Sequence, residues 1–263
     1  YGLYQLGMIA PGRQADFVIL DNVTDLNVVD VYHCGKRVIR DEKGEVKPCP
    51  PHLKNTVHVS GFSEERLKLK HPGGKAHVIQ MLEKQIVTSD VVEEVPWKVL
   101  DGEKYFVPDG EYQKIAVIER HKNTGKMGVG IVKGYGIRGG AIASSVSHDS
   151  HNIIVVGDND RDMALAVKEM MRTQGGYTLV RDGEIYGTLP LPVMGLMSDA
   201  GYESVNEALA KMIPKAYEMG VKDGFDPFIT LSFMALPVIP EIRITPRGIY
   251  LVKEDRMLRT PFS

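Results

Sequence analysis

Two histidines and an aspartate lie close together in the segment Ser147-His148-Asp149-Ser150-His151-Asn152. An imidazole changes its charge near neutral pH, so it can accept or donate a proton, and a carboxylate beside it can fix its tautomer. If a turn near Asp149-Ser150 joins two strands, its ends come within about 7 Å and both histidines can converge on one ligand. The segment is therefore the first candidate for catalysis or recognition.

A turn without chemistry accounts for the same residue types. Asp149, Ser150 and Asn152 are residues that commonly bond to their own backbone in turns. Metal sites are rarer than such turns, and both histidines come from one short stretch. The spacing alone leaves both interpretations open.

Apolar segments lie on both sides of this polar stretch. Small and apolar residues run from Ala141 to Val146, and Ile153 to Val156 are typical of a buried strand. A second polar cluster, Glu119-Arg120-His121, ends the strand predicted from Lys114. An arginine there is typical of an ion-pair anchor, with a substrate clamp as the functional alternative.

The remaining pattern predicts which elements position these residues. Asp158-Asn159-Asp160 predicts the N-cap of a helix over 161–172, and Asp182-Gly183 predicts a type I′ hairpin turn. A second helix is expected over 202–219, capped by Ser198 or Asp199. A further hairpin is expected around Pro246-Arg247-Gly248. Paired strands alternating with helices predict an α+β fold with layered packing over residues 93–263.

The first 92 residues read as β-rich and incomplete. Strands are predicted at Phe17 to Leu20, Val28 to His33 and Arg37 to Arg40, which together make a short meander. The chain begins at Tyr1, without an initiator Met, and enters an organised segment at once. We therefore expect an upstream domain to be missing.

Composition narrows the function classes. The 263 residues carry a formal net charge of -2 and are 43% hydrophobic, so the chain has no basic field for nucleic acid and enough apolar residues for a core. No apolar run approaches the roughly 20 residues that span a bilayer, so neither membrane nor export is expected and the default compartment is the cytoplasm. Cys34 and Cys49 form no C-x-x-C pair and are interpreted as incidental thiols.

Several longer strings resemble those of the adenine deaminase family within the amidohydrolase superfamily. The segment from Gly7 to Gly12 with Ala15-Asp16 is similar to the return from the catalytic barrel into the small β domain of amidohydrolases. More specific strings are Glu119-Arg120-His121, Gly139 to Ser145 leading into His148 to Asn152, Leu189 to Pro192 with Gly195 to Asp199, and Asp226 to Phe228 through Leu236 to Pro240. The resemblance covers nearly the whole chain and identifies it with the C-terminal part of that family.

The resemblance implies a fold and a reaction. Residues 1–92 would be part of the β-rich amidohydrolase composite domain, and residues 93–263 the C-terminal α+β domain. The reaction would be hydrolytic deamination of adenine to hypoxanthine and ammonia by a metal-activated water, a step of purine salvage. The divalent metal, Mn, Fe or Zn, would lie in an upstream TIM-like barrel that this sequence lacks; no metal or other cofactor is expected in this chain.

The resemblance also implies roles for the polar segment. His148, Asp149 and His151 would orient substrate or move protons at the mouth of the barrel, and Ser147 and Asn152 would bind substrate, Asn152 by holding the loop or contacting a purine edge. The partners would be adenine, the upstream barrel and further copies of the chain in a homo-oligomer. The alternative is a polar turn or a contact between subunits.

Three functions remain open from the sequence. The first is a C-terminal portion of an adenine deaminase that is inactive without its barrel. The second is a free-standing purine-binding or regulatory module without catalysis. The third is a self-contained metallohydrolase that uses His148, Asp149 and His151; it is disfavoured because its ligands come from one short loop without a remote partner.

Overall fold

The structure is a computed structural model that describes residues 1–38 and 48–262. It contains two compact units, which divide between Pro48 and Cys49. Its mixture of strands and helices confirms the predicted α+β class. None of the described helices has both the length and the apolar character needed to cross a membrane.

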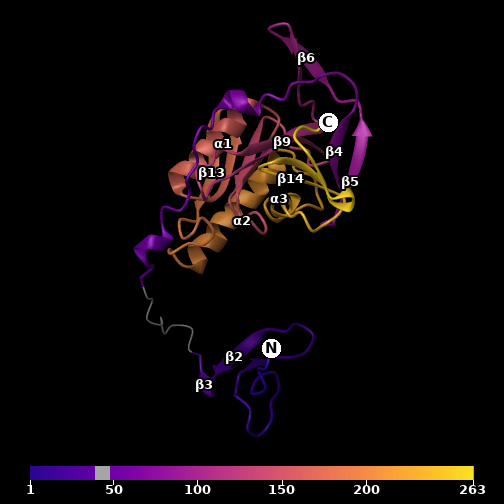
Figure 1. Ribbon diagram of the computed structural model, residues 1–263. Helices are drawn as coiled ribbons and strands as arrows, with labels where there is room; N and C mark the ends of the chain where they lie inside the picture. Colours follow the sequence, from indigo (N-terminus) through magenta and orange to yellow (C-terminus); the bar gives the residue numbers. More distant parts are fainter. Residues whose placement is uncertain (39–47, 263) are drawn as a thin grey trace. The chain divides into compact units, whose positions relative to one another are not determined.

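The first unit is a three-stranded antiparallel sheet (Figure 1). Its strands are β1 (Phe17–Leu20), β2 (Val28–His33) and β3 (Lys36–Arg37). The first two strands match the predicted meander. The third begins at Lys36, and the predicted end of that strand, at residues 39 and 40, lies outside the described residues.

The second unit is organised around an eight-stranded sheet with the order β13-β12-β10-β11-β8-β9-β4-β5. All neighbouring strands are antiparallel except β4 and β9, which are parallel. The strands of this sheet are β4 (Ala76–Met81), β5 (Thr88–Glu93), β8 (Tyr112–Ile118), β9 (Met127–Lys133), β10 (Gly140–Ser144), β11 (Ile153–Gly157), β12 (Gly176–Arg181) and β13 (Glu184–Pro190).

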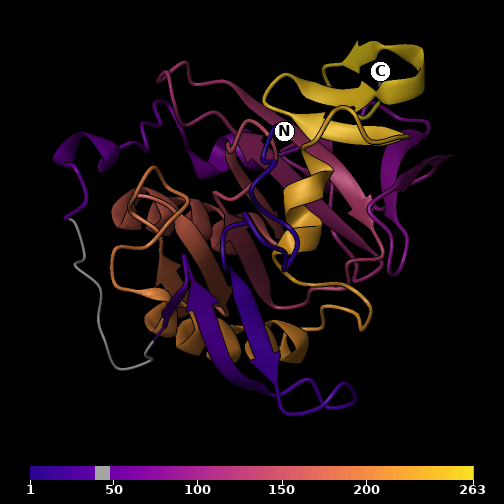
Figure 2. The ribbon, with the colours of Figure 1, turned by 90° about the horizontal axis from the view of Figure 1, so that it is seen from below.

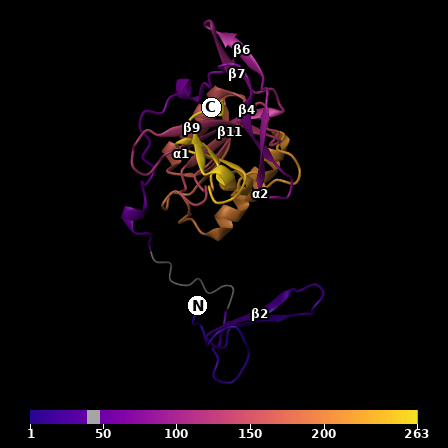
Figure 3. The ribbon, with the colours of Figure 1, turned by 45° about the vertical axis from the view of Figure 1, so that its right-hand side comes forward.

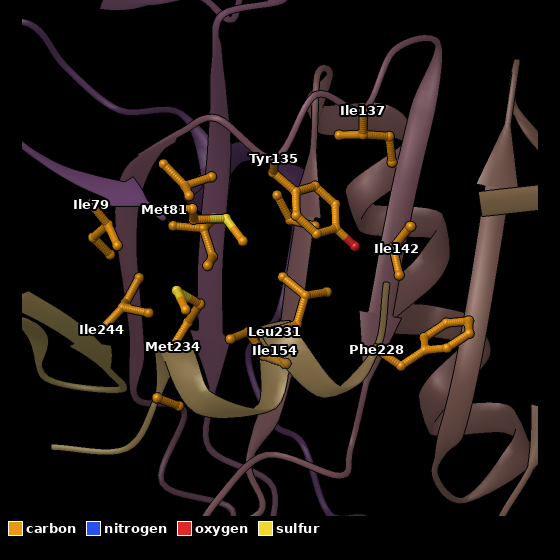
Figure 4. Close-up of a cluster of buried hydrophobic side chains, with 14 of the residues drawn as sticks. Ile79, Met81, Tyr135, Ile137, Ile142, Ile154, Phe228, Leu231, Met234 and Ile244 are labelled. Carbon is orange, nitrogen blue, oxygen red and sulfur yellow. The ribbon is translucent and has the colours of Figure 1, made fainter. Parts of the chain in front are cut away.

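The central strands of this sheet are buried on both faces, since successive side chains point to opposite sides and all residues of β8, β10 and β11 are buried. On β8, Ala116 and Ile118 pack with helix α1 (Asp160–Thr173), whereas Ile115 and Val117 pack on the other face. That other face is covered by α2 (Tyr202–Glu218), α3 (Ile229–Met234) and the C-terminal strands. Figure 4 shows α3 placing Leu231 and Met234 over the sheet.

Smaller elements complete the second unit. The C-terminal strands form a separate antiparallel sheet, seen in yellow beside α3 in Figure 2. A two-stranded hairpin of β6 and β7 projects from the large sheet (Figure 3). The bounds are β6 (Trp97–Leu100), β7 (Glu103–Phe106), β14 (Ile242–Thr245), β15 (Gly248–Leu251), β16 (Arg256–Leu258), and the short 3-10 helices η1 (Pro51–Leu53), η2 (Glu64–Leu67) and η3 (Val252–Glu254).

The predicted helices and hairpins of the second unit are present, with one wrong cap. Asn159 caps α1 by accepting a hydrogen bond from the backbone N–H of Asp162 at 2.8 Å, as predicted. Helix α2 has no side-chain cap and begins after Gly201. Neither predicted cap is available, because Ser198 accepts a hydrogen bond from the N–H of Ala200 and Asp199 pairs with Lys54.

The predicted boundary between residues 1–92 and 93–263 is displaced in the structure. Strands β4 and β5 do not belong to the first unit, because β4 hydrogen-bonds to β9 through Ile79↔Val132 and buries its side chains in the core of the large sheet. Residues 49–92 therefore fold with the C-terminal unit, and the boundary lies at residues 48 and 49. The pattern of short strands did not reveal which sheet they join.

Candidate functional site

The polar segment 145–152 connects two adjacent central strands of the large sheet. Strands β10 and β11 pair antiparallel, with Ser144 opposite Ile154. Both strands are fully buried, so the connection is held at a fixed edge of the core. The prediction that a turn here joins two strands is confirmed.

His148 lies on the loop with a partly exposed side chain. Its side chain is 40% exposed. Its backbone N–H donates to the carbonyl and the hydroxyl of Ser232, at 3.1 and 3.2 Å, which fastens this end of the loop to α3. The imidazole lies beside Phe233, with ring centroids 5.3 Å apart. Within the described part of the chain, neither ring nitrogen of His148 makes a hydrogen bond, and the nearest charged group to Nδ1 is the carboxylate of Asp149.

His151 is held by the backbone of Ser147. The N–H of Ser147 donates to Nδ1 of His151 at 3.2 Å, and the N–H of His151 donates to the carbonyl of Ser147 at 2.6 Å. An imidazole that accepts at Nδ1 and is neutral carries its proton on Nε2. Burial and then the neighbouring His148 and Arg120 lower the pKa of His151, so the neutral form is favoured.

The two histidines converge, as the spacing predicted. Their ring centroids are 5.4 Å apart in an edge-to-face arrangement. Asp149 is less closely associated, because its side chain is 83% exposed and its Oδ1 lies 3.9 Å from Nδ1 of His148. That distance is too long for a hydrogen bond. The structure therefore assigns the fixing of a tautomer to Ser147 acting on His151 and shows no such bond between Asp149 and His148.

Ser147 and Asn152 are buried rather than presented to solvent. The amide of Asn152 donates to the hydroxyl of Ser150 at 3.0 Å and accepts from the N–H of Arg120 at 3.4 Å. Of the two roles expected for Asn152, these contacts provide the one that holds the loop. The hydroxyl of Ser147 has no hydrogen-bond partner among the described residues.

The cluster Glu119-Arg120-His121, which follows β8, contacts the loop through two of its side chains. His121 Nε2 lies 2.6 Å from the carbonyl oxygen of Ser150. Arg120 donates from its guanidinium to the carbonyl oxygens of His151 and Met194. The ion-pair anchor does not describe this arginine, because its side-chain partners in the described structure are backbone carbonyls. The substrate clamp stays a prediction.

A pocket of about 360 Å³ opens beside the loop. Polar residues from the loop form one wall, and an apolar segment after α3 and the β14–β15 turn form the others; its lining includes Asp149, Ser150, Asn152, Leu236, Pro237 and Pro246. No sequence motif marked the turn at Pro246 as part of a site, because that residue carries no chemistry of its own. The combination of an apolar wall with a few polar groups is typical of a small-molecule site.

The loop does not have the geometry of a metal site. His151 uses Nδ1 as an acceptor, and Asp149 is turned to solvent. Within residues 1–38 and 48–262, the one group of three metal-type side chains is Asp16, His33 and Cys34, all exposed on the first unit. There Nδ1 of His33 faces Asp16 at 3.0 Å while Nε2 faces Cys34 at 3.6 Å, so the two ring nitrogens serve different partners.

Glu119 shapes the turn that carries His121, and its ionisation makes that turn sensitive to acid. Burial alone would raise the pKa of Glu119, but hydrogen bonds from the N–H groups of Thr124, Lys122 and His121 and from the Thr124 hydroxyl lower it to about 2. The pKa is depressed on folding, so the stabilisation is complete above about pH 4.5 and is lost as the pH falls toward 2.

We therefore expect Glu119→Gln to destabilise the chain at pH 7 by about 1 kcal/mol, a value reduced for solvent screening. The difference from the unchanged chain should shrink at pH 3. Urea unfolding of both proteins at the two pH values measures it. A Glu65→Gln control, at an exposed position on η2, should show no such convergence. A gap for Glu119→Gln that is as wide at pH 3 as at pH 7 would contradict the assignment.

The chain is similar to a family of known proteins. A sequence model of the adenine deaminase C-terminal domain matches residues 85–256. A protein named adenine deaminase from Desulfitobacterium hafniense is 51% identical over 259 residues, covering 98% of this chain and 45% of that protein. Proteins of the same name from Nitratidesulfovibrio vulgaris and Clostridium acetobutylicum are 44% and 42% identical, covering 96% and 98% of this chain and 44% and 46% of theirs.

The chain thus spans less than half the length of these curated relatives. The resemblance drawn from its strings is confirmed, and it extends over nearly the whole chain. By the family match and by these identities, the chain belongs to the adenine deaminase family.

Proposed function

We propose that this chain is the C-terminal part of an adenine deaminase, which hydrolyses adenine to hypoxanthine and ammonia as a step of purine salvage in the cytoplasm. The family match and the names of the relatives support this activity. One observation supports a role for this part of the enzyme in the active site. His148 and His151 converge on a loop that joins the ends of the buried central strands β10 and β11.

In this proposal the metal belongs to the upstream part of the protein. The donors of the loop do not fit a metal ion, so we place the divalent metal, Mn, Fe or Zn, in an upstream barrel. When bound there, it would lower the pKa of a water molecule and so supply the nucleophile for the purine ring. This chain would then supply positioning and proton transfer, and it would be inactive alone.

The two histidines take different parts. The side chain of His148 is 40% exposed and its ring nitrogens make no hydrogen bond among the described residues, so it is the residue suited to carry a proton between solvent and the substrate. His151 is held with its proton on Nε2, so it is suited to donate a hydrogen bond to a ring nitrogen of the purine. Ser147 supports the second role, because its N–H fixes the tautomer.

We also propose that the first unit associates with the upstream part and that the whole protein is a homo-oligomer. Apolar side chains on β1 and β2 support the first proposal, since Val18 is 52% and Val29 is 58% exposed. Exposed apolar residues gathered on one small sheet are typical of a surface that packs against another element.

The test compares two proteins. Deamination of adenine is followed by its absorbance, with divalent metal supplied, for this chain alone and for the chain extended upstream through the barrel. Activity in the extended protein only is the expected result. Activity of this chain alone would contradict the placement of the metal, and no activity in either protein would contradict the proposed reaction.

The pocket beside the loop favours a second candidate, a purine-binding module without catalysis. Its volume of about 360 Å³ lies in the range typical of small-molecule sites, and its lining combines apolar and polar residues. Calorimetric titration of this chain with adenine distinguishes the two. Binding by this chain together with an inactive extended protein would favour the module.

A further inference from the structure

A buried arginine beneath the loop has no acidic partner in the described structure. Arg120 is 1% exposed, and burial is the cause that lowers its pKa to about 10. A guanidinium without a counter-ion is costly to bury. Hydrogen bonds from Nε and Nη2 offset part of that cost, while Nη1 has no hydrogen-bond partner among the described residues. What those bonds join indicates what the arginine does.

The side chain joins two loops. Nε donates to the carbonyl oxygen of His151 at 2.5 Å, and Nη2 donates to the carbonyl oxygen of Met194 at 3.0 Å. The planar fork of an arginine holds two acceptors in a fixed relation, which the single ammonium of a lysine does not. The carbonyl that Arg120 holds belongs to the same residue whose imidazole is fixed by Ser147.

The surroundings leave Arg120 little freedom. A Cβ at Gly195 would lie 2.7 Å from Nη1 of Arg120, so the absence of a side chain at Gly195 makes room for the guanidinium. The loop that contains Met194 is itself fixed, because the N–H of Met194 donates to the carbonyl of Leu53 at 2.7 Å. A path of hydrogen bonds therefore runs from η1 through Met194 and Arg120 to His151.

We propose that Arg120 is a positioning residue that sets the orientation of His151. The effect of Arg120 on catalysis rests on the proposed function, because it acts through the role given to His151. The orientation of the His151 ring by Arg120 does not depend on that function. When Arg120 is replaced, the carbonyl of His151 loses its donor, the turn rotates, and the Ser147 N–H no longer fixes the ring.

Nitrogen NMR of the histidine rings in this chain tests the positioning without any activity. In the unchanged chain, Nδ1 of His151 should show the shift of an unprotonated ring nitrogen at neutral pH. In Arg120→Lys it should move toward the average of the two tautomers. The control is Arg243→Lys, because Arg243 is equally buried, has a pKa lowered by burial to about 10, and bonds the carbonyls of Ile86, Pro240 and Ile242 instead.

A second variant covers the case in which Arg120→Lys does not fold. Gly195→Ala should displace the guanidinium and shift the His151 signal. Gly74→Ala should leave the signal unchanged, because its backbone has a similar φ (+79° against +69°) and nothing lies within 4 Å of the added Cβ. An unchanged His151 signal in folded Arg120→Lys, or in Gly195→Ala, would overturn the proposal.

Measurements of kcat distinguish a failure of the positioning role of Arg120 from a failure of the proposed role of His151. In the upstream-extended protein, Arg120→Lys should lower kcat by on the order of a hundredfold, because a misplaced group loses its alignment with the substrate. Arg243→Lys should retain kcat. A shifted His151 signal with full activity would refute the proposed role of His151 while leaving Arg120 as its positioning residue. A hundredfold loss with an unshifted signal would refute the positioning instead.

Discussion

Replacement of His148 by Gln in the upstream-extended protein is expected to lower kcat for adenine by about 10²- to 10⁴-fold, the usual contribution of a group that transfers a proton. The structure favours this histidine because its side chain is 40% exposed and its ring nitrogens make no hydrogen bond in the described structure. Glutamine keeps a side chain of similar reach but cannot exchange a proton near neutral pH. Steady-state kinetics between pH 5 and 9 measure the effect.

Two variants make the result specific to this residue. His52→Ala removes an exposed histidine from η1, outside the loop, and should leave kcat unchanged. Asp149→Asn should cost less than tenfold, because the carboxylate lies 3.9 Å from Nδ1 of His148 and is 83% exposed, so screening weakens their interaction. A His148→Gln protein with unchanged kcat and an unchanged pH profile would refute the proton-transfer role.

Elements with strong local signals were predictable from the sequence. Asn159 provides an N-cap, and Asp182 and Gly183 both adopt positive φ in the turn between β12 and β13, as the type I′ assignment required. The compact units divide at residues 48 and 49 and not after residue 92, because sheet membership depends on distant pairing. Ile79 pairs with Val132, and nothing in the sequence of either strand indicates that pairing.

The candidate loop was predictable and its internal bonding was not. The residue types and the two flanking apolar stretches located His148 and His151 on a turn between strands. Which group fixes an imidazole depends on backbone direction, and the structure gives that role to the N–H of Ser147, where Asp149 was expected. The same holds for Arg120, because carbonyl acceptors are present at every residue and carry no sequence signal.

The largest effect on stability is expected where the large sheet buries a lysine. Lys114 lies on β8 with its side chain 3% exposed, and it pairs with Asp160 at the first residue of α1. Burial lowers the pKa of Lys114, and the charge of Asp160 opposes that change. Asp160→Asn leaves the ammonium without its counter-ion, so we expect a loss of about 3 kcal/mol. That corresponds to a fall in Tm of about 6 to 12 °C, measured by calorimetry.

A double-mutant cycle distinguishes the lost pairing from damage to the helix. Lys114→Met removes the charge that needs a partner, so Lys114→Met with Asp160→Asn should recover most of the stability lost in Asp160→Asn. Glu207→Gln breaks an exposed pair with Lys211 on α2 and should change Tm little. If the double variant were as unstable as Asp160→Asn, the loss would come from the start of α1, where a negative charge favours the helix, and not from the unpaired lysine.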